Sequence, residues 1–283
     1  MTAARDIVFA RHGAAHGFAW LKDSYAMFRR VRLAWILLLI SYYMMLALVD
    51  FVPLVGGFAA PLLKPVFAVG FLAAAWTQER GGVPAIRQLF QGFRSNLPAL
   101  SSLGIVFVVG MLVAVGSTAA IDGGKLFDLL ANPAPQNLDQ DAVAQRLSDT
   151  LSDTRVQLGM LVAALCAIPT LLALWWAPAL VVFQDASAVA ALAASLRAAI
   201  ANWRPVIRYV ISVFFFGGIV PTLAGTIIAL VLPPPIGRAL ALGLMLPYEL
   251  CFVATLHIAD YVSYRDVFHA GETLAPMGGP EKT

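Results

Sequence analysis

Long apolar runs dominate the pattern of hydrophobic and polar positions along this chain. They cover residues 33–49 with a continuation over 51–55, then 58–76, 97–121, 156–183, 209–232 and 239–261. A helix needs about 20 apolar residues to cross roughly 30 Å of hydrocarbon, because each residue adds about 1.5 Å. The pattern therefore predicts an all-α, polytopic membrane bundle of six transmembrane helices.

Three shorter stretches carry apolar residues at the spacing of a helix that is apolar on one face. They are Phe18, Leu21, Tyr25 and Phe28; Ile86, Leu89, Phe90, Phe93 and Leu97; and Val189, Leu192, Leu196, Ala199 and Trp203. Such helices lie in the plane of the lipid headgroups. We predict three interfacial helices on one side of the membrane. The basic residues expected to face headgroups are Arg29, Arg30, Arg87, Arg94, Arg197 and Arg204.

An internal threefold repeat would account for this order of elements. The units cover about 14–80, 84–184 and 186–268, and each holds an interfacial helix, a span, a connection and a second span. Asn96 and Asn202 stand at the same junction in units two and three, each shortly before a proline. We treat residues 1–283 as a single integral membrane domain.

A proline lies within the second span of each unit, at Pro65, Pro169 and Pro247. A proline inside a helix removes one backbone hydrogen bond, which can open a carbonyl to a ligand or simply kink the helix. Prolines are common in ordinary spans, so the kink is the favoured interpretation.

The basic residues are distributed unevenly about the spans. Of 19 Lys and Arg residues, those on the side opposite the termini are Lys125, Arg146, Arg155 and Arg238. Cytoplasmic segments carry the excess of Lys and Arg, which predicts that both termini are cytoplasmic. The polar stretch 122–155 is then the extracytoplasmic loop, and Val143, Leu147 and Leu151 predict a short amphipathic helix within it.

Composition narrows the class further. The chain is 60% hydrophobic and 12% charged, which is far less charge than the quarter or so of a soluble domain. The pI near 9.0 does not indicate nucleic-acid binding, because the positive charges flank apolar runs. The two cysteines, Cys166 and Cys251, both lie inside spans and have no partner at metal or redox spacing.

Lys64 and Glu249 are the charges placed well inside spans. An ionised group at that depth costs at least ~2.5 kcal/mol, so we expect both to face the bundle interior and each other. One interpretation is a substrate, ion or proton site. The alternatives are a structural pair or a Lys64 that extends toward the headgroups.

Other candidate chemistry is sparse. His12 and His16 are four residues apart and could bind a metal ion from one helical face, but no third ligand stands nearby in the sequence. Surface histidines are the simpler interpretation. We expect no catalytic residue, no metal and no cofactor.

Several segments resemble a family of uncharacterised Gram-negative inner-membrane proteins over nearly the whole chain. They are Trp-Leu-Lys at 20–22, Phe-Arg-Arg at 28–30, Leu-Phe-Gln-Gly-Phe-Arg at 89–94, Trp-Ala-Pro-Ala-Leu-Val at 176–181, Asn-Trp-Arg-Pro at 202–205 and Ser-Tyr-Arg-Asp-Val-Phe at 263–268. More distantly, the chain looks like the membrane domain appended to some glycerophosphodiester phosphodiesterases, whose catalytic barrel is absent here. The resemblance implies six spans and an inner-membrane location, and transfers no catalytic residue.

The leading functional hypothesis is a non-enzymatic inner-membrane protein that contacts membrane lipids and serves envelope or lipid homeostasis. The alternatives are a small transporter or channel that uses Lys64 and Glu249, and an intramembrane enzyme. An enzyme should bring several polar residues to one depth, and the sequence offers only that pair. No nucleic-acid partner is expected, and a protein partner or homo-oligomer stays open.

Overall fold

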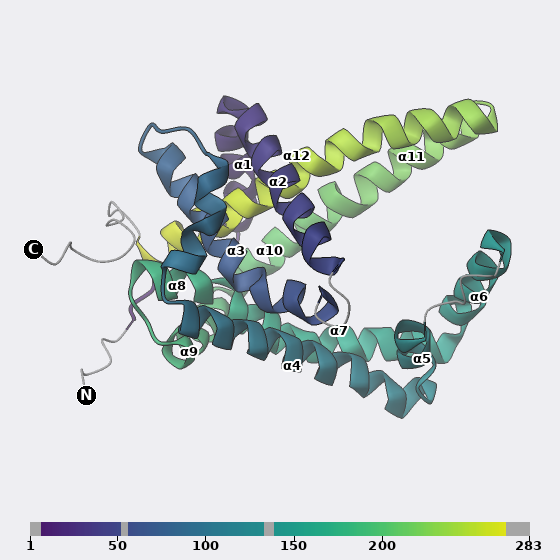
Figure 1. The fold of residues 1–283 in the computed structure, drawn as a ribbon, viewed down its shortest axis with the longest axis horizontal. Helices are drawn as coiled ribbons and strands as arrows, with labels where there is room; N and C mark the ends of the chain where they lie inside the picture. The colour runs from purple at the N-terminus through teal and green to yellow at the C-terminus, as the bar shows by residue number, and fades with distance from the viewer. Residues whose placement is uncertain (1–6, 52–55, 133–138, 270–283) are drawn as a thin grey trace, which may run out of the picture.

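The computed structural model describes residues 7–51, 56–132 and 139–269. Within them every regular element is helical (Figure 1). The elements are α1 (Ala15–Arg30), α2 (Arg32–Asp50), α3 (Gly56–Glu79), η1 (Ile86–Arg94), α4 (Leu97–Asp122), α5 (Lys125–Ala131), α6 (Gln140–Ser152), α7 (Thr154–Trp175), α8 (Ala177–Phe183), α9 (Ala188–Ala201), α10 (Trp203–Phe214), η2 (Phe215–Ile219), α11 (Val220–Val231) and α12 (Pro234–Phe268). The element η1 is a 3-10 helix, and η2 is a π-helical segment.

Six helical segments are long and apolar enough to cross a membrane, which confirms the predicted number among the described residues. They are Arg32–Val49, Ala59–Glu79, Leu97–Asp122, Thr154–Phe183, Trp203–Val231 and Pro235–Phe268. The fifth segment begins earlier than the apolar run at 209. Helix α10 extends back through the charged residues Arg204 and Arg208, which interrupt the run but not the helix.

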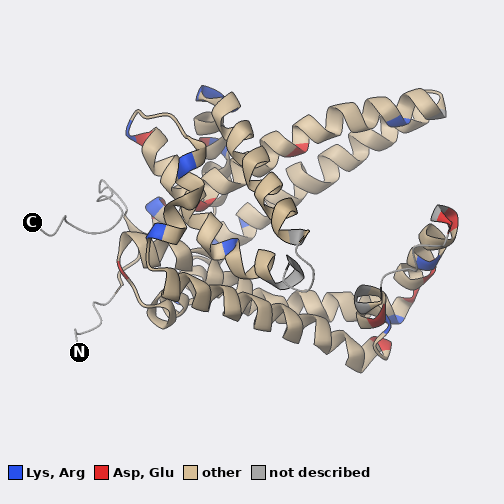
Figure 2. Ribbon diagram, in the orientation of Figure 1, with Lys and Arg blue, Asp and Glu red and all other residues tan. Residues whose placement is uncertain are grey.

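The two ends of the described chain lie together at one end of the molecule, which we call the terminal end (Figure 1). There the Ala10 amide donates to the Val267 carbonyl over 2.7 Å. Helices α5 and α6, from the polar stretch 122–155, lie at the opposite end. Lys and Arg residues gather toward the terminal end, whereas α5 and α6 carry both signs of charge (Figure 2). Residues 1–6 and 270–283 lie outside the described residues, and the cytoplasmic side of the termini stays a prediction.

Local signals set where several helices begin. Asn96 accepts a hydrogen bond from the Ala99 amide over 3.2 Å and so caps α4, and Asp153 accepts one from the Arg155 amide over 2.8 Å at the start of α7. Pro221 has no N–H to donate, and the π-helical segment η2 lies directly before it. The π-helical turn adjusts the backbone before the proline, so the chain stays helical from α10 through α11.

The three segments predicted as interfacial are helical, and each packs against a second span of the predicted repeat. Helix α1 contacts α12, η1 contacts α3, and α9 contacts α7. Glycine permits the close approach of η1, because a Cβ on Gly92 would lie 2.0 Å from the Val66 carbonyl oxygen. Each predicted unit therefore takes part in these contacts, in cyclic order. The repeat and the headgroup placement both stay predictions.

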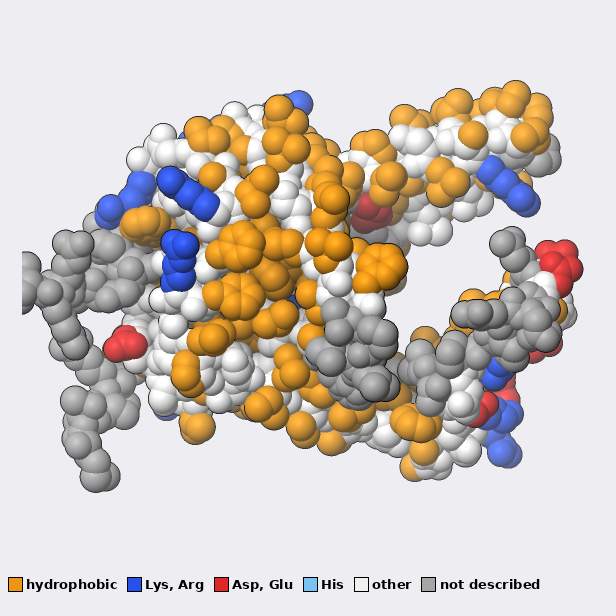
Figure 3. All heavy atoms as spheres, in the orientation of Figure 1, with side chains coloured by type: hydrophobic (Ala, Val, Ile, Leu, Met, Phe, Trp, Pro, Cys, Tyr) orange, Lys and Arg blue, Asp and Glu red, His pale blue; other side chains and the backbone are white. Residues whose placement is uncertain are grey.

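Two helical hairpins extend from the rest of the bundle as separate arms (Figures 1 and 3). The first arm is formed by α11 with the first half of α12, and the second by α4 and α7 with α5 and α6 at its tip. We compare the share of buried residues over an 18-residue stretch of each span. This share is 6% in Trp203–Val231 and 11% in Pro235–Phe268, but 56% in Ala59–Glu79. The first arm therefore packs mainly within itself, whereas α4 of the second arm also packs against α3.

Candidate functional site

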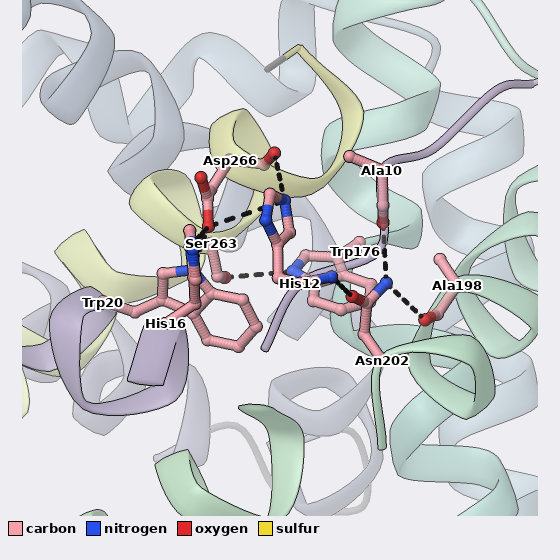
Figure 4. Close-up of polar contacts among 9 residues, drawn as sticks. All are labelled: Ala10, His12, His16, Trp20, Trp176, Ala198, Asn202, Ser263 and Asp266. Carbon is pink, nitrogen blue, oxygen red and sulfur yellow. Dashed lines mark hydrogen bonds and ion pairs between the residues drawn. The ribbon is translucent and has the colours of Figure 1, made fainter. Parts of the chain in front are cut away.

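A cluster of polar side chains joins the N-terminal segment to the end of α12 at the terminal end. We call it the terminal clasp, and it consists of His12, His16, Trp20, Asn202 and Asp266 (Figure 4). His16 and Trp20 lie on α1, four residues apart, so they share one helical face. Asp266 belongs to the last turn of α12. The clasp therefore connects residues about 250 positions apart in the sequence.

The carboxylate of Asp266 is the centre of the clasp. Its Oδ2 accepts a hydrogen bond from Trp20 Nε1 over 2.7 Å and lies 2.8 Å from His16 Nδ1. His12 Nε2 lies 2.9 Å from the Asp266 backbone carbonyl and 3.7 Å from the same Oδ2. The two imidazole rings stack with their centroids 4.3 Å apart. Two ring nitrogens and a carboxylate oxygen thus converge on one point.

Asn202 holds the N-terminal segment in place for this arrangement. Its Oδ1 accepts from the His12 amide over 2.8 Å, and its Nδ2 donates to the Ala10 carbonyl over 2.9 Å and to the Ala198 carbonyl over 3.0 Å. The Asn202 side chain is buried, at 1% exposed. A buried amide with both ends satisfied fixes the backbone that it bonds, and here that backbone carries His12.

The clasp has the chemistry of a metal site. His12, His16 and Asp266 each place a ligand atom within 4.8 Å of the other two, and all three residues are partly buried. Imidazole nitrogen with carboxylate oxygen suits borderline divalent ions such as Zn²⁺ and Ni²⁺ better than Mg²⁺ or Ca²⁺, which prefer oxygen alone. The sequence showed the two histidines but not the third ligand, because Asp266 meets them only through the fold.

The intramembrane charges are not brought together as an ion pair. Lys64 is exposed, and its Nζ lies over the Phe107 ring of α4, 4.9 Å from the ring centroid. Glu249 is half-buried on α12. Among the described residues, no ion pair links either side chain to a partner. A functional role for the two charges stays a prediction.

The other residues singled out from the sequence occupy helices or helix ends. Pro65, Pro169 and Pro247 all lie inside helices, within α3, α7 and α12. All six arginines expected to face headgroups are exposed, namely Arg29, Arg30, Arg87, Arg94, Arg197 and Arg204. Two of them lie over a neighbouring aromatic ring: Arg29 over Tyr25 and Arg204 over Trp203. Exposure is necessary for headgroup contact, which itself stays a prediction.

A shallow apolar groove follows the first half of α12 on the first arm. Its lining residues are Pro235, Ile236, Ala239, Leu240, Gly243 and Leu244. These residues span nine steps of helix, or about 14 Å at the usual rise. The groove owes its depth to the small residues Ala239 and Gly243, and a Cβ added at Gly243 would meet no atom within 4 Å.

Ion pairs tie together the segment at the tip of the second arm. Lys125 of α5 pairs with Asp153, and Arg146 of α6 lies 3.7 Å from Asp128. The hydrogen bond from Lys125 holds the pKa of Asp153 below its ordinary value, and the Arg155 amide acts in the same direction. Both pairs are solvent-exposed, so they orient α5 and α6 more than they stabilise the fold.

The six membrane-length helices define the class of protein as a multi-pass α-helical membrane protein. The chain is 29% identical over 268 residues to a probable inner membrane protein of Burkholderia thailandensis, and the match covers 93% of this chain and 94% of that protein. This likeness and the six membrane-length helices support a multi-pass inner membrane protein. No family model and no solved structure matches the chain. The relative's name states no activity and mentions no phosphodiesterase, so the distant likeness to that membrane domain stays a prediction.

Proposed function

We propose that this protein is a non-enzymatic inner-membrane protein that holds a phospholipid acyl chain along α12 and serves envelope or lipid homeostasis. The observation that carries the proposal is the open apolar groove on the first arm, lined by Ala239, Leu240 and Gly243 among others. The groove lies on a helix long and apolar enough to cross the membrane, so we expect lipid acyl chains to surround it.

The exposure of the first arm favours lipid over protein as the occupant. Leu242 and Leu246 beside the groove are 73% and 65% exposed, and Leu230 of α11 is 80% exposed. Exposed leucines give helices little reason to associate in a bilayer, because lipid tails are equally apolar. The small residues Ala239 and Gly243 would also admit a second helix, and the test below distinguishes that occupant from lipid. Gly237 of α12 packs against α11, and it does not line the groove.

The basic residues at the terminal end fit the same role. Six exposed arginines on or beside α1, η1, α9 and α10 could bind the phosphates of anionic headgroups, each contributing about 1 kcal/mol near a charged membrane surface. The transporter alternative gains no comparable support, since Lys64 and Glu249 form no ion pair with each other. A lipid-contacting protein is therefore the function that the geometry favours.

The groove can be tested by filling it. The protein is reconstituted with phosphatidylglycerol that carries a photoactivatable acyl chain, and the crosslinked peptides are quantified. Gly243→Leu should lower crosslinking to segment 235–244 severalfold, because the new side chain occupies the groove. The matched control is Gly116→Leu on α4, where an added Cβ also meets no atom within 4 Å, and it should change nothing.

Two results would refute the proposal. Equal crosslinking of segment 235–244 in both variants would show that no chain occupies the groove. Replacement of the lipid by a second protein copy, detected as a disulfide between Leu240→Cys protomers in the same vesicles, would show that the groove is an interface.

A further inference from the structure

We propose that the terminal clasp binds a divalent first-row transition metal ion of the Zn²⁺ class through His12, His16 and Asp266. This site lies at the terminal end, on other residues than the α12 groove, and does not depend on the lipid role. The ligand atoms are His12 Nε2, His16 Nδ1 and Asp266 Oδ2.

The spacing of the ligand atoms is close to what such an ion requires. Two ligand atoms bound to a tetrahedral Zn²⁺ at ~2.0–2.1 Å lie about 3.3 Å from each other. In the clasp, Asp266 Oδ2 lies 2.8 Å from His16 Nδ1 and 3.7 Å from His12 Nε2. These two separations bracket the required one, and the third, between the two ring nitrogens, is within 4.8 Å, so side-chain rotation must bring the imidazoles onto the ion. A protein set of three ligands leaves a fourth position for water or another ligand.

Hydrogen bonds from neighbouring residues position two of the ligands. Trp20 Nε1 donates to Asp266 Oδ2, the ligand oxygen itself, which keeps a second lone pair for the ion, and Asn202 fixes the backbone of His12. Trp20 and Asn202 are both 1% exposed. Metal sites depend on such supporting hydrogen bonds to orient their ligands. His16 is the most accessible ligand, with 44% of its side chain exposed, and it provides a route of entry for the ion.

Binding exchanges existing hydrogen bonds for metal bonds. His16 Nδ1 and His12 Nε2 now lie within hydrogen-bond distance of Asp266 oxygens, and each ring nitrogen must be deprotonated to ligate the ion. The ion then replaces those two contacts with three bonds that still connect the start of the chain to the end of α12. The bound form should therefore be more resistant to heat than the free form.

The test uses the full chain in detergent, purified without a histidine tag and stripped with a chelator. Co²⁺ serves as the spectroscopic probe and Zn²⁺ as the competitor, with Mg²⁺ as the negative control. We expect about one Co²⁺ per chain by elemental analysis, a visible absorption band that Zn²⁺ removes, and a higher thermal midpoint with Zn²⁺. Mg²⁺ should produce none of these effects.

Two variants identify the ligands. His16→Ala removes a partly exposed ligand side chain, and it should weaken Co²⁺ binding at least tenfold. Asp266→Asn keeps an oxygen that can accept from Trp20 but loses the charge, and it should weaken binding similarly. Asp128→Asn on α5, at the far end of the molecule, is the control and should bind like the wild type.

The proposal is overturned by either of two outcomes. The wild-type protein could take up no more Co²⁺ than His16→Ala does, which would make the clasp a hydrogen-bonded connection only. Alternatively, both ligand variants could keep wild-type affinity while remaining folded by circular dichroism, which would place any bound ion elsewhere.

Discussion

Replacing Asn202 by alanine should loosen the attachment of the N-terminal segment to the bundle without disturbing the spans. The Asn202 side chain makes three hydrogen bonds, to the His12 amide, the Ala10 carbonyl and the Ala198 carbonyl. The Ala198 carbonyl also accepts from the Asn202 backbone amide over 2.9 Å, so its loss is small. The variant therefore leaves two backbone groups, at Ala10 and His12, without the partner that the structure gives them.

The size of the effect follows from those two groups. A buried polar group left without a partner costs roughly 1–3 kcal/mol. Ala10 and His12 are both half-buried, so water can reach them in part and the lower end of that range applies. We expect Asn202→Ala to lower the free energy of unfolding by about 2–3 kcal/mol.

Asn96 provides the matched control, because it stands at the same junction in the preceding unit of the predicted repeat. Its side chain accepts one hydrogen bond, from the Ala99 amide, and caps only its own helix. Asn96→Ala should therefore cost about 1 kcal/mol, as an ordinary helix cap does.

The assay is reversible unfolding in mixed micelles, read together with amide hydrogen exchange over residues 7–14. Only Asn202→Ala should accelerate exchange in that segment, since Asn96 makes no contact with it. Equal losses of free energy in the two variants, with unchanged exchange at Ala10 and His12, would refute the reasoning and leave Asn202 as a simple cap.

Three further predictions concern other parts of the fold. Gly17→Ala should destabilise the protein by about 1–3 kcal/mol, because its Cβ would lie 2.1 Å from a carbonyl of α10, whereas Gly13→Ala should be neutral. Thermal unfolding of the two variants checks this, and equal midpoints would contradict it. Lys64→Met and Glu249→Gln should have additive effects on stability, with a coupling below about 0.5 kcal/mol, since the two side chains form no ion pair. A double variant that recovers the loss of a single one would show that they pair. Asp153 has a pKa below its ordinary value of 3.8, so its contribution to stability is present above that pH and is lost as the pH falls through the lowered pKa. The protection factors of the α5 amides, taken relative to the intrinsic exchange rate at each pH, should therefore fall at the acidic end in the wild type, and Asp153→Asn should remove this dependence.

The six spans could be predicted because the length of an apolar run is a local property of the sequence. The prediction failed in detail where charges interrupt a run without ending the helix, as at Arg204 and Arg208 in α10. The segment 86–94 was expected to follow α-helical spacing, but it is a 3-10 helix. Gly92 contacts the backbone at Val66 there, and such close packing against another helix can override the local pattern.

The candidate site could be predicted only in part, because its members lie far apart in the sequence. The spacing of His12 and His16 suggested a shared face, yet their common partner Asp266 follows after about 250 residues. Asn202 was marked by its place before Pro205, which suggested a helix start equivalent to that at Asn96. The structure shows that the two asparagines act differently, and nothing local in the sequence distinguishes them.

The cyclic order of helix contacts explains why the two chain ends need a strong connection. Helices η1 and α9 pack against α3 and α7, which precede them in the chain, so each can dock as soon as it is made. Helix α1 packs against α12, which is completed last, so this contact closes over a far longer loop. Closing a long loop costs more chain entropy than closing a short one, although the cost rises slowly with length. The terminal clasp bonds α1 and its preceding segment to α12 and α9. Its polar contacts therefore lie where chain connectivity gives helix packing the least help.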